Sequence, residues 1–195
     1  MGKKIIIFGA GDIAELAHFY FTHDSEYDVA AFCVDKAYIS ETEKCGLPVV
    51  AFEDVETHFP PHEYGGFVAL SYSKMNSIRR QKYDAMKDKG YKLVSYVSSK
   101  ASTFATFECG DNCFILEDNT IQPFVTIGNN VTLWSGNHIG HHSTLHDDIF
   151  ISSHVVVSGG VVMHDGCFLG VNSTLYNHIT LGPRTAVWIR PFIGR

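Results

Sequence analysis

The second half of the chain carries an aliphatic residue at every sixth position, thirteen times in succession from Ile115 to Val187. A helix repeats every 3.6 residues and an amphipathic strand every two, so this period fits neither. It predicts a solenoid of short parallel strands, in which each six-residue segment forms one side of a triangular coil and its aliphatic residue points inward. Small or branched residues that also fit a narrow interior stand two positions earlier, at Val125, Val131, Ser143, Val155, Val161, Cys167 and Ser173.

This pattern is typical of the left-handed parallel β-helix, an all-β fold, which we assign to residues 98–195. Three segments make one coil of 18 residues, so residues 18 apart stack. His146 is then expected over His164, and His142, Gly160 and His178 in one column. Glycine directly follows the aliphatic residue at several turns, which suits an unusual backbone angle, namely at Gly128, Gly140, Gly170 and Gly182.

Strand-like and helix-like segments alternate in the first half. We expect helices from about residue 12 to His23 and over Asn76–Lys89, the second stopping at Gly90. The expected strands are Lys4–Phe8, Val29–Val34, Pro48–Val50, Gly66–Tyr72 and Lys92–Val97. The alternation predicts a small parallel α/β domain over residues 1–97, half the size of a doubly wound fold and therefore a half-Rossmann domain. The boundary falls near residues 97–103, and the first coils over 97–114 are degenerate, as terminal repeats often are.

Composition narrows the class of partner. The net charge is −6 without a basic stripe, which argues against nucleic-acid binding. No run of eighteen apolar residues predicts a membrane span, and residues 1–8 form a strand rather than a signal peptide. The five cysteines are scattered, and Cys109 and Cys113 have no second pair to complete a zinc site. They indicate reduced, mostly structural thiols in a cytoplasmic protein.

A glycine-rich turn follows the first expected strand. Gly9 and Gly11, with Asp12 at the start of the next helix, have the geometry that lets a backbone approach a pyrophosphate at a helix N-terminus. Asp35 closes the second strand, where a carboxylate accepts hydrogen bonds from a ribose or a base edge. The turn favours a nucleotide-containing ligand over a tight turn that binds nothing. A redox dinucleotide is the least favoured ligand, because the domain is too short.

Histidines concentrate in the repeat, most densely over residues 134–146. His141 is the strongest candidate for chemistry, because it lies on a coil beside Gly140 and near Gly159 and Gly160 of the next coil. A neutral imidazole there can take a proton from an attacking amine or hydroxyl. A backbone N–H at Gly159 can stabilise the oxyanion that develops on an acyl carbonyl.

Together these features resemble the hexapeptide-repeat acyltransferases of the sialic acid O-acetyltransferase and bacterial nucleotide-amino-sugar N-acetyltransferase group. The resemblance covers essentially the whole chain. It is carried by Gly9-Ala10-Gly11, by Cys33-Val34-Asp35, and by three stretches of the repeat, residues 134–143, 158–161 and 167–173.

The resemblance implies a homotrimer with active sites between adjacent β-helices. The N-terminal domain would hold a nucleotide-linked sugar through Gly9, Gly11, Asp12 and Asp35. Acetyl-CoA, the acyl-donor co-substrate, would lie along the coils beside Gly159, Gly160, Gly170 and Val171. His141 corresponds to the general base, with His142 next to it, and Gly159 to the glycine whose N–H faces the acetyl oxygen. No metal is implied.

Two departures from the group stand out. Many members have Glu or Asp after the base to orient it, as in a triad, whereas this chain has His142; the sequence leaves open whether Asp147 or Asp148 takes that role. After Gly182 the chain leaves the pattern and ends at Arg195, where relatives add a coil and a tail that helps hold the coenzyme. A weakened coenzyme site is therefore an expectation.

We therefore expect a cytoplasmic acetyl-CoA-dependent acyltransferase acting on an amino or hydroxyl group of a nucleotide-linked sugar, as in polysaccharide biosynthesis. Three alternatives stay open. One is a non-catalytic nucleotide-sugar-binding or scaffold protein with a truncated coenzyme site. Another is a zinc protein similar to β-helical carbonic anhydrases, using His141 and His146, although residues 122–124 offer no third ligand. The last is a dehydrogenase, which rests on the glycine-rich turn alone.

Overall fold

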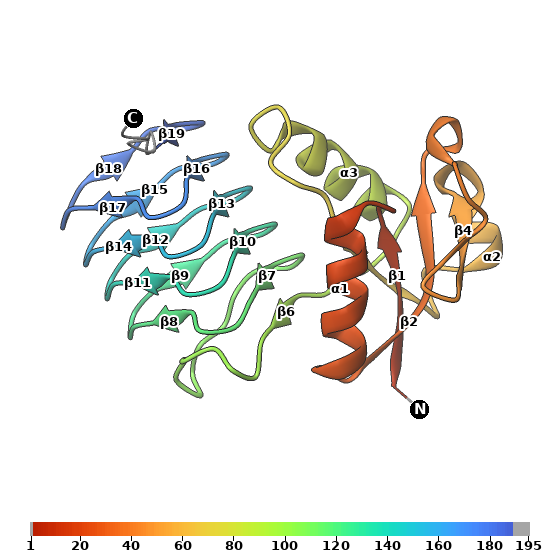
Figure 1. Ribbon diagram of the computed structural model, residues 1–195, viewed down its shortest axis with the longest axis horizontal. Coiled ribbons are helices and arrows are strands. Elements are labelled where there is room, and N and C mark those ends of the chain that lie inside the picture. Colours follow the sequence, from red (N-terminus) through yellow and green to blue (C-terminus); the bar gives the residue numbers. More distant parts are fainter. Residues whose placement is uncertain (1, 189–195) are drawn as a thin grey trace, which may run out of the picture. The chain divides into compact units, whose positions relative to one another are not determined.

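A computed structural model describes residues 2–188 (Figure 1). The chain divides into two compact units, the first ending at Tyr96 and the second beginning at Val97. The C-terminal segment in which the sequence departs from the repeat lies, from residue 189 onward, outside the described residues.

The first unit is a five-stranded sheet with the strand order β3-β4-β2-β1-β5. All neighbours are parallel except β3 and β4. In chain order the elements are β1 (Lys3–Phe8), α1 (Asp12–His23), β2 (Tyr27–Val34), the short 3₁₀ turn η1 (Lys36–Tyr38), β3 (Glu43–Lys44), β4 (Leu47–Ala51), the short 3₁₀ turn η2 (Phe52–Asp54), α2 (Val55–His58), β5 (Gly65–Val68) and α3 (Ser77–Asp88).

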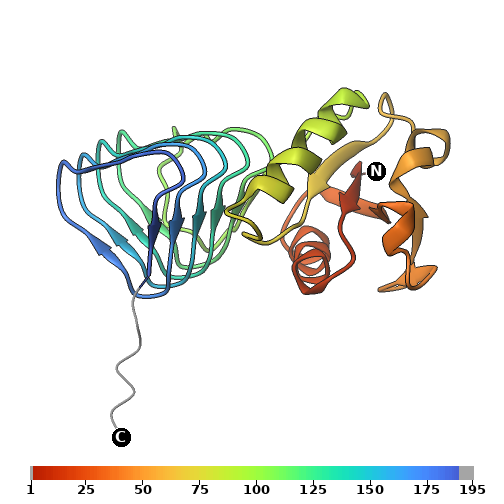
Figure 2. The ribbon, with the colours of Figure 1, turned by 90° about the horizontal axis from the view of Figure 1, so that it is seen from above.

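The two long helices cover opposite faces of this sheet (Figure 2). On one face Phe21 of α1 packs edge-on against Phe67, with ring centroids 5.0 Å apart. On the other face Met86 of α3 joins a buried cluster with Ile6 and Phe8. Because both faces are covered, β1 is apolar in four successive residues rather than alternating, as buried parallel strands are.

The strand expected over Lys92–Val97 is only partly present. Leu93 makes a single bridge to Gly66, and the chain then leaves this sheet. Gly66 donates to the Lys92 carbonyl and accepts from the Val94 N–H, and β5 itself ends at Val68, short of the expected Tyr72. The second unit begins at Val97, so the expected strand is reduced to this bridge before the chain passes into the solenoid.

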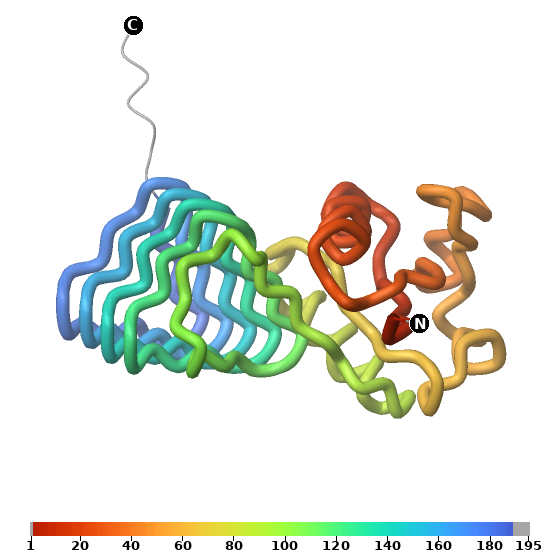
Figure 3. Tube along the Cα trace, turned by 90° about the horizontal axis from the view of Figure 1, so that it is seen from below, coloured from red at the N-terminus to blue at the C-terminus, as the bar shows by residue number. Residues whose placement is uncertain are grey.

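The second unit is the predicted left-handed parallel β-helix, whose stacked coils are visible in Figure 3. Its two-residue strands form three sheets, and paired residues are 18 apart, as Leu133 and Ile151 are. Sheet A holds β6 (Tyr96–Val97), β7 (Phe114–Ile115), β10 (Thr132–Leu133), β13 (Phe150–Ile151), β16 (Phe168–Leu169) and β19 (Ala186–Val187). Sheet B holds β8 (Thr120–Ile121), β11 (His138–Ile139), β14 (Val156–Val157) and β17 (Thr174–Leu175). Sheet C holds β9 (Thr126–Ile127), β12 (Thr144–Leu145), β15 (Val162–Met163) and β18 (Thr180–Leu181).

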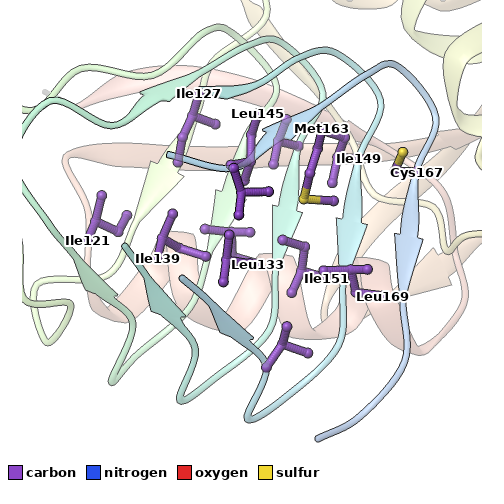
Figure 4. Packing of buried hydrophobic residues seen from close by; sticks show 14 of the residues in the cluster. Ile121, Ile127, Leu133, Ile139, Leu145, Ile149, Ile151, Met163, Cys167 and Leu169 are labelled. Atoms are coloured by element: carbon purple, nitrogen blue, oxygen red, sulfur yellow. The ribbon is translucent and has the colours of Figure 1, made fainter. Parts of the chain in front are cut away.

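The interior of the coils is filled by the aliphatic residues of the six-residue period (Figure 4). Leu133, Ile139 and Met163 are fully buried there. Residues two positions earlier also point inward, as Ile149 and Cys167 do. Each fully buried side chain of this size contributes about 1.5–3 kcal/mol relative to exposure, and repetition along the stack makes the prism a continuous core.

The unusual backbone angle of the turns does not lie where we expected it. Gly128, Gly140, Gly170 and Gly182 have no positive φ; the left-handed residue comes two positions later in each turn, for example Asn130, His142, Asn172 and Arg184. Gly140 is instead required for close approach, since a Cβ there would lie 2.6 Å from the Ser158 carbonyl carbon and 2.7 Å from the Gly159 nitrogen. The expectation was wrong because none of the four glycines has a positive φ, and at Gly128 and Gly140 it is the adjacent coil that leaves no room for a side chain.

Polar ladders close the turns that join sheet C to sheet A. Asn129 donates its backbone N–H to Asp147 at 2.8 Å, and Asp147 donates its own to Asp165 at 3.0 Å. A second, buried ladder runs from Asn112 through Asn130 to Asp148, with both hydrogen bonds 2.7 Å long. Turn N–H groups and buried side chains that would otherwise lack partners are thus satisfied by the next coil.

No helix between residues 2 and 188 has the length and apolar character that crossing a bilayer demands.

All five cysteines, which lie in the described part of the chain, are thiols rather than disulfides. Burial raises the pKa of the Cys33 thiol, and the nearby Asp35 raises it further. Cys33 therefore packs as an uncharged core residue.

Candidate active site on the solenoid and nucleotide site on the first unit

One edge of the solenoid gathers the candidate catalytic residues. We call it the histidine edge; it consists of the turns from sheet B to sheet C, residues 122–125, 140–143, 158–161 and 176–179. His141 and His142 are both exposed there. The predicted column of His142, Gly160 and His178 is confirmed, because the His178 ring lies directly over Gly160.

His141 is held from two sides. Its backbone N–H donates to Oε1 of Gln122 in the preceding coil at 2.9 Å. Its Nδ1 lies 3.0 Å from Nδ1 of His142, whose ring packs on Phe124 with centroids 4.6 Å apart. In the tautomer with the hydrogen on His141 Nδ1, His142 Nδ1 accepts that hydrogen and the lone pair of His141 is on Nε2, the ring nitrogen beside Gly159. His142 thus lies within hydrogen-bond distance of the Nδ1 atom of His141.

Gly159 packs against the His141 ring. A Cβ at residue 159 would lie 2.7 Å from Cε1 and 2.8 Å from Nε2 of His141, so glycine leaves room for the imidazole in this position. The Gly159 N–H, which the sequence suggested as an oxyanion donor, donates to Oδ1 of Asn177 at 3.0 Å. Asn177 was not singled out from the sequence, although it stands 18 residues after Gly159.

Asp147 and Asp148 do not orient His141. Both belong to the ladders between sheets C and A, where they accept from Asn129 and Asn130. His146 lies in that same set of turns and stacks on His164, with centroids 5.0 Å apart and an interplanar angle of 8°, as predicted from the 18-residue coil. His141 and His146 therefore occupy different edges of the prism, which removes the geometric basis of the paired-histidine zinc alternative.

The residues expected to contact the coenzyme do not all lie on one edge. Gly159 and Gly160 belong to the histidine edge, whereas Gly170 and Val171 belong to a turn from sheet A to sheet B, where Val171 is 53 % exposed. Within one chain, sheet B separates the two groups. Among residues 2–188, no three His, Cys, Asp or Glu side chains are arranged to hold a metal ion.

The glycine-rich turn of the first unit lies at the carboxyl end of β1. Gly9 has φ of +125°, and a Cβ there would lie 2.7 Å from the Ala69 carbonyl oxygen, so this glycine is required by the fold. Gly11 is the N-cap of α1 and has open space where a Cβ would stand. Asp12 is the exposed first residue of α1. The helix N-terminus at Gly11 is therefore accessible to an anion.

Asp35 has a partner that the sequence did not predict. Nζ of Lys82, on α3, lies 2.5 Å from its Oδ1, and both side chains are largely buried. The same ammonium group lies 5.2 Å from the centre of the Phe8 ring. A carboxylate and an ammonium group thus stand side by side at the end of β2, presenting an acceptor and a donor.

Comparison with known proteins supports the fold. Residues 108–141 match a family model described as bacterial transferase hexapeptide (six repeats). No curated protein matches the sequence significantly. Several solved structures match nearly the whole chain, at identities of 17–20 % for those described here.

The acetyltransferase domain of PglB from Neisseria gonorrhoeae FA1090 superposes with a TM-score of 0.83 at 19 % identity, covering 95 % of this chain and 88 % of that one. A histidine-to-asparagine variant of perosamine N-acetyltransferase from Caulobacter crescentus, in complex with CoA and GDP-perosamine, gives 0.81 at 20 % identity, covering 94 % and 84 %. WeeI from Acinetobacter baumannii AYE gives 0.68 at 17 % identity, covering 94 % and 88 %. The chain therefore carries the hexapeptide repeat and has the two-part fold of these proteins, and the resemblance inferred from the sequence is confirmed at that level.

Proposed function

We propose that this protein is an acetyl-CoA-dependent acetyltransferase that modifies an amino group of a nucleotide-linked sugar. The observation that carries the proposal is the arrangement of His141, which is fixed through Nδ1 by His142 and packs against Gly159. It is supported by the shared fold with the PglB acetyltransferase domain, also solved with acetyl coenzyme A, and with perosamine N-acetyltransferase, solved with CoA and GDP-perosamine.

His141 is the general base in this proposal. Acetyl-CoA supplies the thioester whose carbonyl carbon is attacked directly. As the sugar nitrogen bonds to that carbon, His141 Nε2 accepts a proton from it, and His142 stabilises the imidazolium through Nδ1. The carbon–sulfur bond then breaks, and His141 returns the proton to the departing sulfur. An amine is favoured over a hydroxyl because a neutral amine needs less help from a base that lacks a carboxylate partner.

We assign the nucleotide to the first unit. The open N-terminus of α1 at Gly11 offers backbone N–H groups to a pyrophosphate, and the Asp35–Lys82 pair offers an acceptor and a donor to the ribose or base. Acetyl-CoA is assigned to Gly159, Gly160, Gly170 and Val171. Nucleotide-linked amino sugars of this kind are precursors in cytoplasmic steps of polysaccharide biosynthesis, where we place the protein.

We further propose a homotrimer with the coenzyme groove between subunits. Large aromatic side chains are exposed along the histidine edge, with Phe124 73 % and Tyr176 81 % accessible. Exposed apolar surface of this kind marks interaction sites. A groove between two subunits also brings the edge with Gly170 and Val171 of one copy to the histidine edge of another.

The proposal is tested by thiol release from acetyl-CoA with a panel of nucleotide-linked amino sugars and their hydroxyl counterparts. Wild type is expected to release thiol with an amino sugar, and His141→Ala to lower turnover by about 10²–10⁴-fold, the range for loss of a general base. His146→Ala is the matched control, since it removes an imidazole from another edge and leaves turnover unchanged. Full activity in His141→Ala contradicts the assignment of the base. Binding of a nucleotide-linked sugar without any thiol release across the panel contradicts the enzyme and favours the binding or scaffold alternative.

A further inference from the structure

A hydrogen bond between Gly159 and Asn177 bears on which group could serve as the oxyanion donor. The Gly159 N–H already has an acceptor, because Asn177 Oδ1 lies 3.0 Å away. Since Oδ1 is fixed in this bond, the other end of the carboxamide, Nδ2, points away from Gly159. Nδ2 has no acceptor among residues 2–188, and the Asn177 side chain is exposed on the histidine edge.

The ladders on the neighbouring edge show which side-chain group residue 177 needs in order to accept the turn N–H. There, backbone N–H groups of Asn129 and Asp147 donate to carboxylates 18 residues later, those of Asp147 and Asp165. A carboxylate at residue 177 would accept from Gly159 equally well. A carboxamide also fills this role in the neighbouring ladder, where Asn129 Oδ1 accepts from the Asp111 N–H at 3.0 Å and Asn129 Nδ2 donates to Asp147 at 3.3 Å. At Asn177 only the acceptor is used in this way within the described part of the chain, so its Nδ2 donors lie unused next to a glycine that packs against His141.

We propose that Asn177 is a catalytic residue, whose Nδ2 donates a hydrogen bond to the carbonyl oxygen of the thioester in place of the Gly159 N–H. This inference rests on the proposed acetyl transfer. When the sugar nitrogen attacks, the carbonyl π pair moves onto oxygen, and a fixed N–H donor stabilises that charge. The pair returns to re-form the carbonyl as the carbon–sulfur bond breaks and sulfur leaves with its electrons. Gly159 then has a positioning role, because its N–H fixes the carboxamide through Oδ1.

Two substitutions separate this assignment from the Gly159 alternative. Asn177→Asp keeps an acceptor for the Gly159 N–H and removes the donor. Asn177→Ala removes both and leaves the Gly159 N–H open. If Asn177 is the donor, both variants lower kcat by about 10²–10³-fold, the range for loss of one oxyanion donor, while KM for the nucleotide-linked sugar stays unchanged. If the Gly159 N–H is the donor, Asn177→Ala keeps or raises kcat, which overturns the proposal.

Asp165→Ala is the matched control, because it removes an acceptor of the same kind from a turn N–H on a different edge. It is expected to lower the melting temperature without lowering kcat. The melting temperature of each Asn177 variant separates loss of structure from loss of the donor. The experiment separates the two possible failures. If the proposed function is wrong, the wild type releases no thiol with any acceptor. If only this inference is wrong, the wild type is active and Asn177→Ala is equally active.

Discussion

The left-handed turn positions of the solenoid are filled mostly by residues other than glycine, among them Asn130, His142 and Asp148. Asn and Asp tolerate this conformation better than other residues with a Cβ, and His is enriched there as well. The sequence suggested glycines as the special positions of the turns, and Gly128 and Gly140 are indeed restricted, whereas Gly182 is not. The reason is different, since it is the coil above that leaves no room for a side chain at Gly140.

Gly140→Ala is therefore expected to destabilise the solenoid. Its methyl group would stand 2.6 Å from the backbone carbonyl carbon of Ser158, whose N–H donates to Leu175 and whose carbonyl accepts from the Ser143 hydroxyl, so this backbone has little freedom to move. Overpacking of this kind costs about 1–3 kcal/mol, measured as the free energy of unfolding in urea. Gly182→Ala is the control, because nothing lies within 4 Å of a Cβ there. Equal stability of the two variants would show that the coils separate easily.

Sequence reasoning missed the residues whose role depends on a contact with a residue far away in the chain. Lys82 stands 47 positions after Asp35, in a polar helix whose other charged residues look alike. Asn177 resembles any exposed turn residue until Gly159 is seen to donate to it. Both depend on side-chain directions at the ends of elements, which periodicity does not fix. His141 was found from the sequence because it stands in a recognisable motif, and its catalytic role remains a proposal.

At the scale of elements, the six-residue period was sufficient to predict the aliphatic residues that fill the solenoid from Ile115 to Val187, although Ile149, which also points inward, was not predicted. A strand of two residues has no stability by itself, so each strand exists because its neighbours 18 residues away pair with it. Such dependence makes the period strict, and a strict period is easy to detect. The edge of the first sheet was harder to predict, since the apolar residues over 92–97 pack without continuing the ladder of hydrogen bonds.

The turn between β1 and α1 yields a prediction that separates an effect on protein stability from an effect on nucleotide affinity. Gly11→Ala is expected to lower the free energy of unfolding by no more than about 1 kcal/mol, because the position is open and only the poorer N-cap preference of alanine counts against it. Its methyl group would stand at the N-cap of α1 and weaken binding of the nucleoside diphosphate by about tenfold, or 1.4 kcal/mol, in isothermal titration calorimetry.

Gly9→Ala is the contrasting variant, since its φ of +125° and the Ala69 carbonyl forbid a side chain. It is expected to lose stability rather than affinity alone. Unchanged affinity in Gly11→Ala would mean that the turn does not contact a phosphate.

At the scale of the whole molecule, the proposed trimer predicts a mass in solution of three times the 21.7 kDa of one chain. Multi-angle light scattering measures it directly. Tyr176→Glu places a charge on the histidine edge and is expected to shift the protein toward monomers with loss of acetyl transfer. Thr180→Glu, on an exposed position of sheet C, is the matched control. A wild type that is monomeric at micromolar concentration would contradict the shared groove.

The 18-residue pairing also governs how this chain can change its length during evolution. Duplicating or deleting one complete coil leaves every inward aliphatic residue and every left-handed turn position where the neighbours require it. An insertion of any other size would rotate all later segments onto the wrong side of the prism unless it were looped out at a turn. Lineages with this architecture should therefore differ by whole coils or by loops at the edges, and seldom by one or two residues within a side.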